Sequence, residues 1–87
     1  MTEGAVIALA RAALDRFAAR QIQLPVFVLE LERAVDAAEE IGDPHAGRLR
    51  KAWGELEILN ALTDGPLDEG QGAEVAVLVA DFERLLT

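Results

Sequence analysis

Four acidic side chains stand at helical spacing between residues 36 and 43. They are Asp36, Glu39, Glu40 and Asp43. Positions three and four apart lie on one face of a helix, and carboxylate oxygens are the ligands that Mg²⁺ prefers. Such a face could hold a divalent ion, as paired acidic motifs on two helices do in some all-helical phosphohydrolases. No second acidic pair follows that would face the first, so we interpret the cluster as a solvated helix face and expect no metal site.

Side chains for nucleophilic or general-base catalysis are scarce. The chain has no Cys, Ser or Tyr, and its hydroxyl groups are those of Thr2, Thr63 and Thr87. Covalent catalysis needs a nucleophile activated by a neighbouring base, and His45, the one imidazole, has no such neighbour in the sequence. The residue types therefore predict a protein that is not an enzyme and needs no cofactor.

Acidic residues dominate the charge and are unevenly distributed. The 87 residues include 16 acids and 8 bases, which gives a net charge of −8. Residues 1–24 hold two acids and three bases, a net charge of +1, whereas residues 25–87 hold fourteen acids and five bases, a net charge of −9. Nucleic acids and anionic membrane surfaces are bound by Lys and Arg, so this balance argues against both as direct partners.

One group of acids surrounds a strong turn signal, Thr-Asp-Gly-Pro, at residues 63–66. Its members are Glu55, Glu57, Asp64, Asp68 and Glu69. A short turn would bring these acids onto one surface patch with Asp64 at its centre. The patch could simply keep the protein soluble, or it could attract a strongly basic protein partner, because complementary charge steers association.

Four amphipathic segments must position these side chains. Apolar residues recur at three- and four-residue spacing, which predicts helices, over residues 3–20, from Pro25 to just before Gly42, from Pro44 to Leu62 and, after a cap at Asp68, most clearly from Ala73 to Leu86. Short connections between helices favour antiparallel neighbours, and no segment alternates as a strand would. The sequence predicts an all-α protein, an antiparallel four-helix bundle formed by one domain over residues 1–87.

Several residues predict where these helices begin and end. Asp43 followed by Pro44 is typical of a helix start. Gly42 is typical of the residue that follows a helix. Asp68 with Gln71 three residues later matches a capping box, in which each residue bonds the backbone of the other.

The apolar pattern also predicts a core. Leu9 and Trp53 lie on the stripes that we expect to be buried. Gly54 costs the third helix about 1 kcal/mol relative to Ala, which indicates a close contact or a bend at this position. Some apolar residues fit no single stripe and either widen the core or form a partner surface. They are Ile7, Leu14, Val26, Leu29, Ile58, Leu62 and Val77.

Strongly apolar stretches such as residues 24–29 are far shorter than the roughly 18 residues that a membrane span needs. No basic segment precedes an apolar run near Met1, as it would in a signal peptide. We therefore expect the protein to act in the cytoplasm and to have no membrane partner.

The order of these features resembles the colicin-D-type immunity proteins, the bacterial self-protective colicin-like immunity family. An N-terminal amphipathic helix leads to a polar turn and an aromatic-centred helix start, QIQLPVF, at residues 21–27. A third helix ends in mixed acidic and apolar residues, WGELEIL, at residues 53–59. An acidic loop, DGPLDE, at residues 64–69 precedes a last helix that ends in FERLL at residues 82–86. The resemblance covers nearly the whole chain.

This resemblance implies a four-helix bundle that binds and blocks the catalytic domain of a cognate tRNA-cleaving toxin. In that family, acids near the end of the third helix and in the following loop occupy the basic cleft of the toxin. The matching positions are Glu55, Glu57, Asp64, Asp68 and Glu69. The chain departs from the family at Asn60 and Thr63, where the family tends to carry acids.

We interpret the chain as an immunity protein that inhibits a basic nuclease toxin through an acidic surface. The alternative from another class is a small helical adaptor that binds a partner, or a second copy as a homodimer, through apolar side chains. A third alternative is a metal-dependent helical phosphohydrolase that uses Asp36, Glu39 and Glu40.

Overall fold

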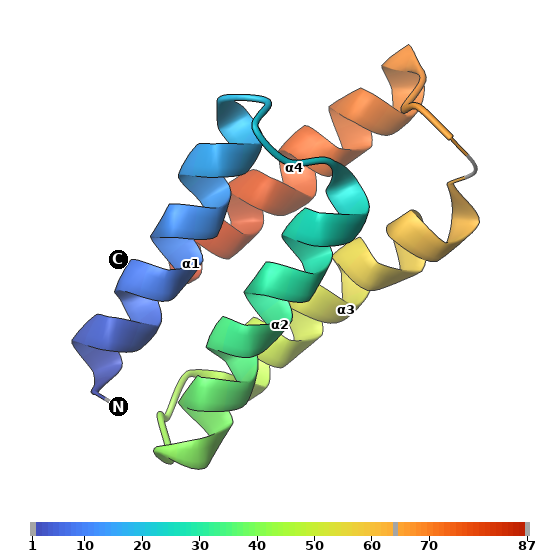
Figure 1. The fold of residues 1–87 in the computed structure, drawn as a ribbon. Helices are drawn as coiled ribbons and strands as arrows, with labels where there is room; N and C mark the ends of the chain where they lie inside the picture. The colour runs from blue at the N-terminus through green and yellow to red at the C-terminus, as the bar shows by residue number, and fades with distance from the viewer. Residues whose placement is uncertain (1, 64, 87) are drawn as a thin grey trace.

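Four helices make up most of the chain in the computed structural model, which describes residues 2–63 and 65–86. They are α1 (Glu3–Ala18), α2 (Leu24–Glu40), α3 (Ala46–Leu62) and α4 (Glu69–Leu85). Consecutive helices run antiparallel and pack against each other (Figure 1). No strand occurs in the described residues. The protein is an all-α antiparallel four-helix bundle, as the sequence predicts.

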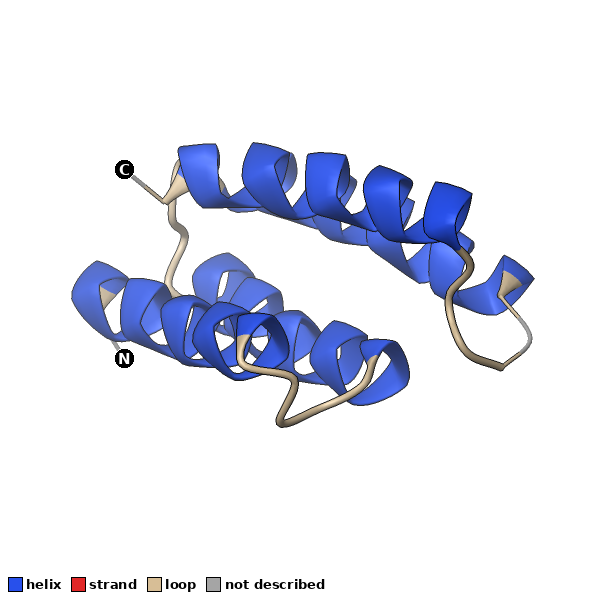
Figure 2. Cartoon of the chain, turned by 90° about the horizontal axis from the view of Figure 1, so that it is seen from above, coloured by secondary structure: helices blue, strands red, loops and turns tan. Residues whose placement is uncertain are grey.

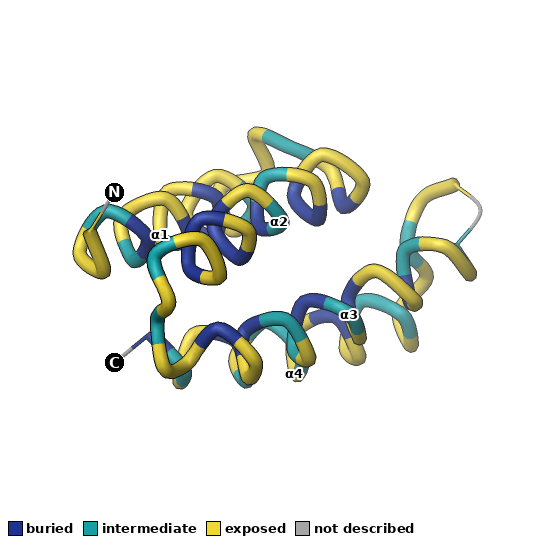
Figure 3. The backbone as a smooth tube through the Cα atoms, turned by 90° about the horizontal axis from the view of Figure 1, so that it is seen from below, coloured by how far each residue is buried: buried dark blue, intermediate teal, exposed yellow. Residues whose placement is uncertain are grey.

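The helices form two layers, α1 with α2 and α3 with α4 (Figures 2 and 3). The α2–α3 connection joins the layers at one end, and the other two connections lie at the opposite end (Figure 1). Within the described residues, α1 and α4 approach each other much less closely than do the consecutive helices. The α1–α4 side is therefore the open side of the bundle.

Apolar side chains fill the space between the layers, and the buried positions face inward on all four helices (Figure 3). The largest fully buried side chains are Phe27, Phe82, Leu31, Leu56, Val6 and Val35. Phe17 of α1 stacks on Phe27, with ring centroids 4.2 Å apart. Within α4 the buried residues are Val75 and Phe82 alone. The core is thus richest beside α2 and thinnest beside α4.

The capping box at the start of α4 is confirmed. The Asp68 carboxylate accepts a hydrogen bond from the Gln71 backbone N–H at 2.7 Å, and the Asp68 N–H donates to Gln71 Oε1 at 3.1 Å. These bonds satisfy amides that a helix start leaves free. Helix α4 therefore begins at Glu69, as the capping box predicts, although Gly70 and Gly72 weaken its first turn.

The predicted start of the third helix is wrong. The Asp43 carboxylate accepts from the His45 N–H at 2.8 Å, which is the bond that a cap makes to the second residue after it. Pro44 and His45 nevertheless form a turn that precedes the regular helix. The Ala46 N–H donates to the Asp43 carbonyl at 3.0 Å, and α3 begins at Ala46 with His45 at the N-cap position.

The predicted end of the second helix is correct, whereas the first helix ends two residues earlier than predicted. Gly42 follows α2 with φ of 71°, as expected of a glycine at that position. The first helix ends at Ala18 and not at Arg20, which adopts φ of 59° outside the helix.

The core prediction needs one correction. Leu9 is 40% exposed, because it lies at the edge of the arc of α1 that α2 covers. Trp53 is buried, as predicted. Of the apolar residues that fit no single helical stripe in the sequence, Leu14 is buried and Ile7 packs against the core. The remainder are exposed, namely Val26, Leu29, Ile58, Leu62 and Val77.

Candidate functional site

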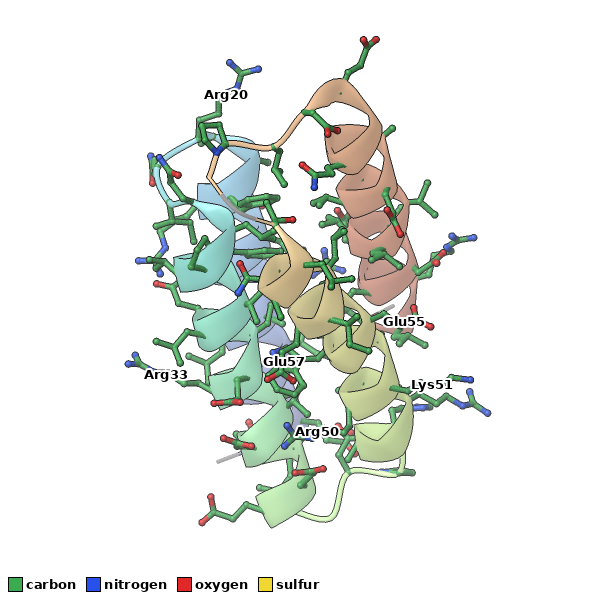
Figure 4. The ribbon with its side chains drawn as sticks, turned by 90° about the vertical axis from the view of Figure 1, so that its right-hand side faces the viewer. Arg20, Arg33, Arg50, Lys51, Glu55 and Glu57 are labelled. Carbon is green, nitrogen blue, oxygen red and sulfur yellow. The ribbon has the colours of Figure 1, made fainter. Side chains whose placement is uncertain are left out.

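Glu55 and Glu57 are both exposed on α3 but point to different sides of it (Figure 4). Neighbours two positions apart on an α-helix are turned by about 200°. Glu55 faces the α4 side, where two bases, Arg48 and Lys51, line a surface hollow together with Glu55 and Asp81. Glu57 lies on the α2 side (Figure 4). The structure therefore does not bring these two predicted site residues together.

Asp68 and Glu69 lie at the start of α4, whose first turn extends beyond the end of α3 (Figure 1). The Asp68 carboxylate is engaged in the capping box, so it has a structural role whether or not it contacts a partner. Glu69 is exposed in the first helical turn, where the helix dipole favours a negative charge. Asp64, the predicted centre of the acidic patch, lies outside the described residues. The other four acids occupy three separate places.

Further acids follow the predicted patch along the sequence. Between Lys51 and Arg84 the sequence contains no basic residue, so every charged side chain from residue 52 to residue 83 is an acid. This stretch adds acids on α4 that the sequence prediction missed, namely Glu74, Asp81 and Glu83. The sequence signal for these acids is the stretch without bases between Lys51 and Arg84. Clustering of acids around one turn does not include them.

Most acids of this stretch are not neutralised by a neighbouring base. Asp81 pairs with Arg84, whereas Glu55, Glu57 and Glu69 form no ion pair with any residue that the structure describes. Their charges act through water on whatever approaches the α3–α4 layer. We call residues 52–83 the acid-only segment.

The acids of α2 are arranged differently. Arg50 of α3 donates from Nη2 to Asp36 and Glu39, both at 2.6 Å, and from Nε to Glu39 at 3.1 Å. The hydrogen bonds from Arg50 hold the pKa of Glu39 below its ordinary value. The same bonds from Glu39 and Asp36 raise the pKa of Arg50. These carboxylates bind a guanidinium and tie α2 to α3.

This arrangement bears on the metal alternative. Asp36 and Glu39 accept hydrogen bonds from one guanidinium, so a cation already occupies the place where the sequence could put Mg²⁺. No group of three or more His, Cys, Asp or Glu side chains that could hold a metal ion occurs in residues 2–63 and 65–86. His45 is exposed at the start of α3.

Apolar side chains accompany the acids on the outer face of α3. Glu55, Ile58 and Leu62 are spaced three and four residues apart, so they share one face of the helix. The residues Ile58 and Leu62 are 63% and 75% exposed. Protein interfaces combine apolar contacts with a charged rim, and this face has both components.

Comparison with known proteins adds no assignment, because no family model, no curated protein and no solved structure matches the chain. None of the described helices is long and apolar enough to cross a membrane. The arrangement of the described residues is therefore what bears on function.

Proposed function

We propose that the chain is a non-enzymatic immunity protein, which acts in the cytoplasm by binding a basic nuclease toxin domain and blocking its cleft. The observation that carries this proposal is the acid-only segment, in which Glu55, Glu57 and Glu69 are exposed and form no ion pair with any described residue. A nuclease cleft is lined by Lys and Arg because it must bind phosphates. Exposed, unpaired acids are complementary to such a cleft and repel the RNA substrate.

The exposed apolar residues of α3 supply the second component of such an interface. Charge complementarity mainly raises the rate of association, whereas a few buried side chains near the centre account for most of the binding energy. Ile58 and Leu62 are suited to that central role because they are exposed beside Glu55 on one face. We expect a partner to contact this face and leave Glu57 at the edge of the contact or outside it.

The test begins with the reading frame adjacent to the gene. We expect it to encode a protein with a basic nuclease domain, whose toxicity in a laboratory host is suppressed when this chain is expressed with it. Purified nuclease domain should bind the chain faster at 50 mM than at 300 mM NaCl, because salt screens exposed charges. Absence of binding at both salt concentrations would contradict the proposal.

Charge reversals then locate the contact. We expect Glu55→Lys and Glu69→Lys to slow association, because both acids are exposed and unpaired among the described residues. Glu40→Lys, at the exposed end of α2, is the matched control and should leave association unchanged apart from the general change in net charge. Equal slowing by all three variants would show that total charge matters and that no particular acidic surface does.

Self-association is the second candidate function, and the exposed apolar residues favour it. Ile58, Leu62 and Val77 are each more than half exposed, and contiguous apolar surface on a small protein often marks a contact site. If this candidate is right, sedimentation at micromolar concentration shows a dimer that Ile58→Asp converts to a monomer. A monomer at all concentrations would exclude the homodimer and leave the immunity proposal unaffected.

A further inference from the structure

A cavity of about 720 Å³ lies at the end of the bundle where the α1–α2 and α3–α4 connections meet. Residues from every helix and from both connections line it. It lies on the side of the bundle that α1 and α4 leave open. Ligand pockets in proteins commonly measure about 300–1,000 Å³. The cavity therefore has the volume of a small-molecule site, and the proposed acidic interface makes no use of it.

The lining combines an apolar interior with polar groups nearer to solvent. Leu24 and Val75 are buried, and Phe17 is half-buried beside them. Gln23 is exposed and Asn60 is half-buried, and their side-chain amides form no hydrogen bond with the residues described. A few free polar groups at the edge of an apolar pocket are what fixes the orientation of a ligand.

Arg20 is the only charged side chain among the described residues that line the cavity. It belongs to the N-terminal segment, residues 1–24, which is positive in a chain of net charge −8. Figure 4 shows Arg20 at the end of the bundle, close to the connection between α3 and α4, with its guanidinium toward solvent. The edge of the cavity is therefore complementary to an anion, although most of the surface repels one.

Arg20 also occupies a backbone position that favours glycine. Its φ is 59°. Its N–H donates to the Phe17 carbonyl at 3.0 Å, and the Gln21 N–H donates to Arg16 at 2.9 Å, which are the two bonds of a Schellman motif. The same kind of helix end in α2 uses Gly42, with φ of 71°. The left-handed conformation disfavours a side chain, but here it carries Arg20, whose charge lies among the residues that line the cavity.

We propose that this cavity binds a monomeric alkyl carboxylate, with the alkyl chain on Leu24 and Val75 and the carboxylate beside Arg20. Burial of the chain supplies most of the affinity, because it removes apolar surface from water. The guanidinium and the free amides of Gln23 and Asn60 select the carboxylate. One cation with neutral donors matches a monoanion, and this inference does not depend on the proposed toxin partner.

Three probes with one chain length separate the contributions of chain and head group. We expect isothermal titration of the full chain, below micellar concentrations, to show that decanoate binds about two- to fivefold more tightly than decanol, the range of one exposed ion pair. Decyltrimethylammonium should bind most weakly. Equal affinities for decanoate and decanol would overturn the assignment of Arg20.

Variants of two exposed arginines test the head-group contact. Arg20→Asn removes the charge while placing a residue that tolerates the left-handed conformation, so it should abolish the preference for decanoate over decanol. Arg33→Gln, on the outer face of α2 and away from the cavity, is the matched control and should retain that preference. Loss of the preference in both variants would mean that net charge, and not this site, produces it.

A substitution that fills the cavity without destabilising the fold tests whether the cavity is the binding site. Gly72 lines the cavity, and a Cβ added there would meet no atom within 4 Å. We expect Gly72→Leu to weaken decanoate binding at least tenfold with no loss of thermal stability. Gly54→Leu, at an equally open position outside the cavity, should leave binding unchanged. Normal binding by Gly72→Leu, or no binding by the native chain, would overturn the proposal.

Discussion

Arg50 of α3 contacts two carboxylates of α2 and the ring of Trp53. It forms hydrogen bonds with Asp36 and Glu39 of α2, and its guanidinium carbon lies 4.9 Å from the centre of the Trp53 ring. Exposed ion pairs contribute little singly, but a bidentate arginine with two carboxylates holds a defined geometry. Its main effect is to fix how α3 lies along α2.

The Arg50 contacts predict a pH dependence of stability. Hydrogen bonds from Arg50 lower the pKa of Glu39 from its ordinary value of 4.5. A carboxylate whose pKa is lower in the folded state stabilises that state above its unfolded pKa, and this contribution disappears as the pH falls through the folded pKa. We expect Glu39→Gln to lower the melting temperature at pH 7 and to have a progressively smaller effect below pH 4.5. A difference from the native chain that stays constant down to pH 2 would contradict this linkage.

Substitution of Gly54 tests helix propensity without creating a new contact. A Cβ added at this position meets no atom within 4 Å, and α3 continues through it without interruption. Neither the close contact nor the bend considered from the sequence is needed to explain the glycine. We therefore expect Gly54→Ala to increase the free energy of unfolding by about 1 kcal/mol, as measured by urea denaturation.

Gly42 provides the matched control for that substitution. Its φ of 71° lies in the left-handed region, which costs a non-glycine residue about 1–2 kcal/mol. Gly42→Ala should therefore destabilise the protein, although space is open around this position as well. If both substitutions stabilised the protein, backbone conformation would not be what distinguishes the two glycines.

At the scale of the helices, Trp53 is the main anchor between α2 and α3. The ring is 7% exposed, and its Nε1–H donates to the Val28 carbonyl at 2.8 Å. We expect Trp53→Phe to reduce the free energy of unfolding by about 1–3 kcal/mol, because the hydrogen bond is lost and the smaller ring leaves a gap. Urea denaturation followed by far-ultraviolet circular dichroism measures this loss. A change below about 0.5 kcal/mol would show that the hydrogen bond and the ring volume matter little here.

The helices could be predicted from the sequence because their apolar spacing is a property of each segment alone. Their ends were harder, because a turn can precede the regular helix. Asp43 bonds the His45 N–H as a cap would, but a turn at Pro44 and His45 delays the regular helix to Ala46, whereas the helix begins directly after Asp68. Leu9 was misassigned because its exposure depends on how much of α1 the neighbouring helix covers. That coverage is set by packing and is not encoded in the spacing.

The candidate site was less predictable than the fold. Glu55 and Glu57 are close in sequence, but the helix turns them to different sides (Figure 4). The absence of bases between Lys51 and Arg84 could be read from the sequence, whereas the placement of Arg48 and Lys51 beside Glu55 and Asp81 depends on how α3 packs against α4. The cavity beside Arg20 could not be predicted, because it arises where α1 and α4 fail to close the bundle.

At the scale of the whole molecule, the surplus of negative charge should oppose folding. The chain has a net charge of −8, and folding confines this charge to a molecule with a radius of gyration of 12.4 Å. Two like charges about 10 Å apart repel by about 0.4 kcal/mol in water, so several such pairs cost about 1 kcal/mol in total. The ion pairs of Arg16 with Glu30, of Arg50 with Asp36 and Glu39, and of Arg84 with Asp81 act in the opposite direction, but the four acids in them are a minority of the 16 in the chain.

Added salt shows whether the repulsion among the acids or the attraction in the ion pairs is larger, because it screens both. We expect the free energy of unfolding to rise by about 1 kcal/mol between 10 and 300 mM NaCl, since repulsion among the acids outweighs the attraction in the ion pairs. The double variant Glu55→Gln with Glu74→Gln should be more stable than the native chain at 10 mM NaCl and less sensitive to added salt. A fall in stability with salt would show that the ion pairs dominate. A rise would mean that the acid-only segment is kept at the expense of stability, which is what selection for a charged binding surface produces.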